Sequence, residues 1–143
     1  MNPVPVFMYH HVSPHKGDMV TVNPDVFEAQ MRFLKEAGYR TLSAEEIVSY
    51  ADEKSAVSGK AVAITFDDGY LDNYVYAFQI LKKYNIKATI FIVTDWVEEA
   101  SNEVRSQESG VRSDTAITPS HEECKNLIAS SQAHKAVMNW DMI

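Results

Sequence analysis

Apolar residues of this chain occur in two alternating patterns, which are short continuous runs and longer stretches with helical spacing. The continuous runs lie at residues 4–9, 39–42, 61–66 and 87–93. Each is predicted to be a strand, because a short apolar run bounded by polar or turn-forming residues is typical of one. The run at 61–66 consists of small, β-branched and aromatic residues. It is typical of a strand buried on both faces, as in parallel sheets and barrels.

Stretches with helical spacing fill the intervals between these runs. Asn23 and Pro24 are typical of a helix start, and Phe27 and Met31 then lie on one helical face. The pattern predicts a helix that packs its apolar face into the core and ends at Gly38.

Two further helices are predicted on either side of the third strand. Residues 43–46 form a capping box, which opens a helix toward Tyr50. Residues 72–84 are predicted to form a helix that Asn85 closes in a left-handed conformation. The apolar face expected for this second helix consists of Val75, Phe78 and Leu81.

The apolar periodicity weakens after the fourth strand. Residues 98–120 are polar and predict a long loop or an insertion. A second capping box begins at Ser120, and Leu127 and Ile128 give the helix that follows an apolar side. Residues 139–143 are predicted to begin one more helix, with about one turn in this chain.

This alternation of strands and helices indicates an α/β fold with parallel strands, in one domain over residues 1–143. The net charge of −7 argues against nucleic acid and anionic membranes as partners, and no apolar run reaches membrane-spanning length. Cys124 is the only cysteine, so no intramolecular disulfide forms, and we expect it on a helix as a small apolar residue.

Asp67 and Asp68 follow the run at 61–66 directly, and they are the main candidates for chemistry. The carboxyl end of a parallel strand is where α/β enzymes build their sites. Adjacent carboxylates repel each other unless a cation or a shared proton relieves them, so one could bind a metal while the other acts as a base. Gly69 would permit the turn that brings both to one site. The alternative is a polar loop entry that caps the next helix.

Several stretches of the chain resemble one family in the right order. Thr65–Tyr70, with the sequence Thr-Phe-Asp-Asp-Gly-Tyr, resembles the first signature of the polysaccharide deacetylases, which are carbohydrate esterases with a NodB-homology domain. Residues 6–14, 27–39 and 88–93 resemble further parts of the branch that acts on poly-N-acetylglucosamine. The matches span residues 4–96, and the resemblance implies part of a distorted (β/α) barrel.

The resemblance also implies roles for individual residues. Asp67 matches the catalytic base of the family and Asp68 its metal-binding aspartate, and the expected ion is a divalent metal such as zinc, bound by Asp68 and two histidines. The metal would polarise an acetamide carbonyl of an N-acetylated glycan and activate water. His10, with His11 behind it, and Tyr70 are further site candidates. The product would be a free amine on the sugar, plus acetate.

The second signature of the family, His-x-x-x-His, is missing after the first signature, because the two histidines beyond Tyr70, His121 and His134, are thirteen residues apart. We therefore expect the chain to be the N-terminal part of a deacetylase domain, truncated before that motif. We also expect it to bind metal weakly or not at all, and to be weakly active or inactive by itself. Part of a barrel would leave apolar surface exposed, which predicts an oligomer or a swapped assembly.

Two other functions were considered. A phosphatase of the haloacid dehalogenase type also ends an apolar strand in aspartate, but it needs Asp-x-Asp, and residue 69 is glycine. A non-catalytic glycan-binding or assembly module that lacks the metal histidines remains the alternative. Residues 1–5 show no signal-peptide pattern, whereas relatives are often exported or associated with the cell envelope.

Overall fold

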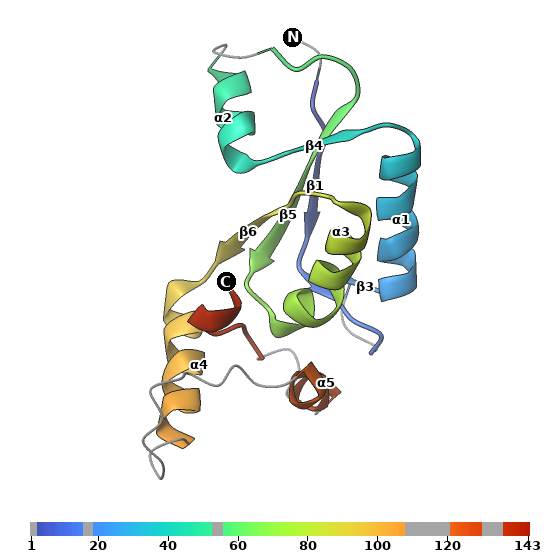
Figure 1. The fold of residues 1–143 in the computed structure, drawn as a ribbon. Helices are drawn as coiled ribbons and strands as arrows, with labels where there is room; N and C mark the ends of the chain where they lie inside the picture. The colour runs from blue at the N-terminus through green and yellow to red at the C-terminus, as the bar shows by residue number, and fades with distance from the viewer. Residues whose placement is uncertain (1–2, 16–18, 53–55, 108–120, 130–135) are drawn as a thin grey trace.

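Four parallel strands form the centre of the fold in the computed structural model, which describes residues 3–15, 19–52, 56–107, 121–129 and 136–143 (Figure 1). The central strand is β5 (Ala61–Asp68). Strand β1 (Val6–Tyr9) pairs with one edge of β5, and β4 (Arg40–Leu42) and β6 (Thr89–Ile92) follow each other along the opposite edge. Every pairing in this sheet is parallel, so the α/β fold expected from the sequence is confirmed.

The remaining elements connect and cover these strands. Two short strands, β2 (His11–Val12) and β3 (Thr21–Val22), form a separate parallel pair. The α-helices are α1 (Pro24–Glu36), α2 (Ala44–Ala51), α3 (Phe78–Tyr84), α4 (Thr94–Gln107) and α5 (His121–Ala129). A π-helical turn, η1 (Asn73–Ala77), precedes α3, and a 3₁₀ turn, η3 (Trp140–Met142), lies near the end. Among the described residues, no helix has the length and apolar character needed to cross a membrane.

The main core lies on one face of the sheet. Helices α1 and α3 lie side by side against this face (Figure 1). The strands contribute Val62, Ile64 and Phe66, and α1 contributes Phe27 and Met31, both fully buried. Each large side chain buried in this way stabilises the fold by about 1.5–3 kcal/mol. The core residues expected on the first helix are confirmed.

The opposite face of the sheet carries exposed apolar side chains. In the parallel register Val6 pairs with Ala63, Met8 with Thr65, and Phe91 with Asp67. Paired residues project to the same face, so these side chains share the face of Asp67. Val6 is 54 %, Met8 63 % and Phe91 56 % exposed. The apolar surface expected for part of a barrel is therefore present.

Local signals in the sequence set the helix ends as expected. Asn23 Oδ1 accepts a hydrogen bond from the backbone N–H of Asp25 at 2.9 Å, which caps α1. Ser43 and Glu46 form the predicted capping box of α2. Asn85 ends α3 with φ 52° and ψ 51°, the left-handed conformation predicted for it.

The predicted helix at 72–84 is only partly correct. Its first part is the π-helical turn η1, in which hydrogen bonds join residues five apart. The wider turn shifts the phase of the side chains, so Val75 and Leu81 are buried as expected, whereas Phe78 is exposed. The prediction that Phe78 belongs to the buried face was wrong.

The loop or insertion expected at 98–120 is also corrected in part. Residues Thr94–Gln107 form α4, while 108–120 lie outside the described residues. The buried side of α4 includes the small residues Val97 and Ser101, and the Ser101 hydroxyl donates to the Val97 carbonyl at 2.7 Å. Buried residues as small as these two do not give strong apolar periodicity.

The later helices agree with most of the remaining expectations. In α5, Ile128 and Cys124 are buried as predicted, but Leu127 is exposed. Near the end of the chain, the helix expected from residue 139 is the single 3₁₀ turn η3.

Candidate functional site

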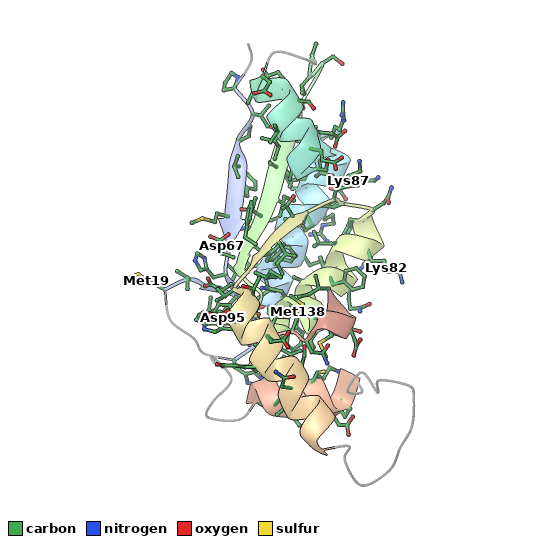
Figure 2. The ribbon with its side chains drawn as sticks, turned by 90° about the vertical axis from the view of Figure 1, so that its left-hand side faces the viewer. Met19, Asp67, Lys82, Lys87, Asp95 and Met138 are labelled. Atoms are coloured by element: carbon green, nitrogen blue, oxygen red, sulfur yellow. The ribbon has the colours of Figure 1, made fainter. Side chains whose placement is uncertain are left out.

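The two carboxylates lie at the carboxyl end of the central strand. Asp67 pairs with Phe91 and Asp68 with Ile92, so both residues still belong to β5. On the other edge, Tyr9 of β1 pairs with Phe66, and His10 therefore leaves its strand beside Asp67. The register thus brings the histidine segment and the aspartates to the same end of two neighbouring strands. Figure 2 shows Asp67 at this end of the strands.

The backbone turns at Asp68 itself. Asp68 has φ 73° and Gly69 has φ 77°, so two successive residues adopt positive φ. Positive φ is unusual for a residue other than glycine, although aspartate tolerates it better than most residues. The turn breaks the strict alternation of side chains along β5, which would otherwise direct Asp67 and Asp68 to opposite faces. The sequence indicated a turn at Gly69, and the structure begins it one residue earlier.

Packing on both sides holds this turn in place. A Cβ atom added at Gly69 would lie 3.1 Å from Ile92 Cγ2, so Ile92 of β6 would have to move slightly to admit a side chain. From the other side, the backbone N–H of Met138 donates to the Gly69 carbonyl at 2.9 Å. The N–H of Leu71 donates to the Ala136 carbonyl at 3.0 Å. The turn after the carboxylates is therefore fixed by two segments distant in sequence.

His11 makes the closest polar contact in this region. Its Nδ1 donates a hydrogen bond to Asp72 Oδ2 at 2.6 Å, and both side chains are buried. The His11 ring also stacks on Tyr70, with ring centroids 3.8 Å apart and an interplanar angle of 25°. Asn73 Nδ2 donates to the His10 carbonyl at 2.9 Å. Residues 70–73, just after the carboxylates, thus hold the segment that follows β1.

Burial raises the pKa of Asp72 above its ordinary value, because desolvation disfavours the charged carboxylate. The hydrogen bond from His11, the charge of His11 and the backbone N–H groups of Val12 and Asn73 oppose that rise. Asp72 was assigned from the sequence only to a helix start. Its pairing with His11, 61 positions away, had no signal in the local pattern.

Trp96 lies beside the candidate site, and the sequence reasoning did not single it out. It lies in the first turn of α4, and its ring centroid is 6.2 Å from that of Tyr70. Trp96 follows the end of β6 as Tyr70 follows the end of β5, and the two strands are paired. Neighbouring parallel strands bring the residues after their carboxyl ends together. The predicted pairing of the two strands could therefore have indicated that Trp96 lies near Tyr70.

A metal would need more ligands than the described residues bring together. Among these residues, no group of three His, Cys, Asp or Glu side chains is arranged to hold a metal ion. A catalytic metal site takes about three protein ligands and one open position. The described part of the chain therefore does not fit a complete metal site, although its carboxylate pair can supply a ligand and a proton acceptor.

Comparisons with known proteins point to one family. The family model described as polysaccharide deacetylase matches residues 54–141. YxkH of Bacillus subtilis (strain 168), which carries the name of the polysaccharide deacetylases, is 44% identical over 90 residues, covering 63% of this chain and 32% of YxkH. A poly-beta-1,6-N-acetyl-D-glucosamine N-deacetylase of Staphylococcus aureus (strain MSSA476) is 36% identical over 95 residues, covering 65% of this chain and 32% of that protein.

A solved structure that resembles this chain is also that of a deacetylase. The Streptococcus pyogenes deacetylase PplD, in complex with acetate, matches with a TM-score of 0.64 and 31% identity. The match covers 86% of this chain and 52% of PplD. The chain thus spans about half of that structure and about a third of the curated relatives it matches.

Proposed function

Because this chain belongs to the polysaccharide deacetylase family, we propose that it is part of a hydrolase that removes N-acetyl groups from an amino-sugar polysaccharide. The relative from Staphylococcus aureus is named for poly-beta-1,6-N-acetyl-D-glucosamine. A polymer of N-acetylated glucosamine is accordingly the proposed substrate. Residues 1–143 are proposed to form the N-terminal part of the catalytic domain, which agrees with the third of each curated relative that they match.

One observation carries this proposal, namely the carboxylate pair at the end of β5 in a fixed left-handed turn. Asp67 is proposed as the base that takes a proton from the attacking water. The water oxygen bonds to the acetamide carbonyl carbon, and the C–N bond then breaks. The nitrogen leaves with a proton as a free amine, and acetate is released.

Asp68 is proposed as a ligand that the described residues give to a divalent metal, with zinc as the expected ion. Since the described residues do not fit a complete metal site, the other ligands must come from outside them. A metal of this kind polarises a carbonyl and lowers the pKa of bound water. The chain by itself is proposed to bind metal weakly and to have little or no activity.

The test is acetate release from N-acetylglucosamine oligomers by the full-length protein that contains this chain. The Asp67→Asn variant should lose most turnover, on the order of 10²-fold or more. Asp25→Asn is a matched control, because it removes an exposed carboxylate from the first turn of α1. Unchanged turnover in Asp67→Asn would exclude this residue as the base.

A non-catalytic glycan-binding module is the second candidate, and the incomplete ligand set among the described residues favours it. The same preparation separates the two functions. Binding of the oligomer without acetate release, at saturating zinc, would support the module and contradict the hydrolase.

A further inference from the structure

An aromatic pair lies beside the carboxylates and has no part in the proposed proton transfer. Tyr70 follows Asp68 by two residues, and Trp96 follows its register partner Ile92 by four. The two ring centroids are 6.2 Å apart, with an interplanar angle of 40°. Figure 2 shows Asp95, the neighbour of Trp96 in sequence, at the same end of the strands as Asp67. The pair therefore borders the candidate site.

The Tyr70 ring is also held by a second contact. It stacks on His11 at 3.8 Å, and His11 is bound to the buried Asp72 at 2.6 Å. A series of contacts thus runs from the buried carboxylate of Asp72 through two stacked rings to Trp96. Side chains fixed in this way lose little conformational entropy when a ligand binds, which favours affinity.

Trp96 is placed for a ligand rather than for the core. It is 40 % exposed, and it is absent from both clusters of core residues, whereas its neighbour Val97 is fully buried. Trp96 is therefore less important than Val97 for anchoring the start of α4. A large aromatic surface left in water next to polar catalytic groups is the usual composition of a ligand site.

We propose that Trp96 and Tyr70 form the surface on which a sugar ring of the substrate stacks next to the carboxylates; this inference rests on the proposed function. The C–H groups on one face of a pyranose ring carry partial positive charge, and the face of an aromatic ring is negative. Asp67, Asp68 and Asp95 make this end of the sheet acidic, which favours a neutral N-acetylated sugar over an anionic one. In this arrangement Trp96 determines the affinity for the polymer, and Tyr70 orients the Trp96 ring.

The experiment measures binding of an N-acetylglucosamine oligomer to the full-length protein by calorimetry, together with kcat and KM for acetate release. Trp96→Ala should weaken binding and raise KM by about 2- to 10-fold, with a smaller change in kcat. Trp96→Leu keeps apolar bulk without the aromatic face and should show the same loss, whereas Trp96→Phe should recover most of the affinity. Phe33→Ala is the matched control, because Phe33 is a 62 % exposed aromatic on α1.

The outcomes separate this inference from the proposed function. If acetate is released but all three Trp96 variants bind like the wild type, the stacking surface is refuted and the hydrolase remains. If the oligomer binds in a Trp96-dependent way without acetate release, the stacking surface stands and the hydrolase fails. Loss of affinity in Trp96→Leu with an unchanged circular dichroism spectrum and melting temperature supports a direct contact. A wild-type protein that binds no oligomer overturns the inference.

Discussion

Replacing Gly69 by alanine should destabilise the protein at the turn that positions the carboxylates. The substitution has two separate costs. Gly69 has φ 77°, and an alanine in a left-handed conformation costs about 1–2 kcal/mol. The new Cβ would also lie 3.1 Å from Ile92 Cγ2 and 3.7 Å from the Ile92 backbone. Moving β6 or Ile92 to relieve that contact should cost about 1–3 kcal/mol more.

Gly38 provides the matched control. Its φ is 74°, nearly the same as that of Gly69, but a Cβ added there has no atom within 4 Å. Gly38→Ala should therefore have only the conformational cost of about 1–2 kcal/mol. The difference between the two variants isolates the contact with Ile92.

The assay is urea unfolding of each variant followed by circular dichroism, which gives the change in the free energy of unfolding. A double-mutant cycle with Ile92→Ala removes Cγ2, so Gly69→Ala in that background should cost about as much as Gly38→Ala. Equal costs of Gly69→Ala and Gly38→Ala in the wild-type background would refute the assigned contact. Acetate release should fall in Gly69→Ala as well, because the turn at Asp68 must shift.

Three further predictions concern the carboxylates, the buried pair and the uncovered face. In the full-length protein, Asp67→Asn should retain zinc and lose most turnover, whereas Asp68→Asn should lose both; equal zinc loss in the two variants, measured by elemental analysis, would contradict these roles. Burial raises the pKa of Asp72 above its ordinary value of 3.8. The stability that protonated Asp72 contributes is therefore fully present below pH 3.8 and is lost as the pH rises through the raised pKa of the folded protein. Wild type should thus gain stability relative to Asp72→Asn as pH falls from about 7 to about 4, and parallel melting temperatures over this range would argue against it. The isolated chain should associate through its uncovered sheet face, and Met8→Lys should reduce that association in light scattering, because Met8 is 63 % exposed there; a monodisperse wild-type monomer would disagree with this expectation.

The sequence by itself determined the elements whose causes are local. Asn23 and Ser43 cap their helices through groups two or three residues away. Asn85 ends α3 through its own tolerance of positive φ. The continuous apolar run at 61–66 predicted a buried central strand, because that composition is typical of a strand whose residues are buried on both faces, and residues 61–66 are all buried. The carboxylates at its end followed directly from the same pattern.

Which side of α3 and of α4 is buried depends on packing against other elements, and the local sequence pattern does not reveal that packing. The π-helical turn η1 moved Phe78 to the surface, although the spacing from Val75 fits an α-helical face. Among the described side chains of α4, which end at Asn102, the buried ones are Val97 and Ser101, and the polar composition of this stretch was taken for a loop. In both cases the buried side was decided by neighbouring elements.

Only the tertiary structure decided how the candidate site is assembled. His11 meets Asp72 across 61 positions because β1 and β5 pair in a parallel register. Trp96 meets Tyr70 because β6 pairs with the other edge of β5. The positive φ of Asp68 arises within a turn held by contacts from distant segments. Residue types and local spacing identify which groups can do chemistry, but strand register and long-range packing determine which of them meet.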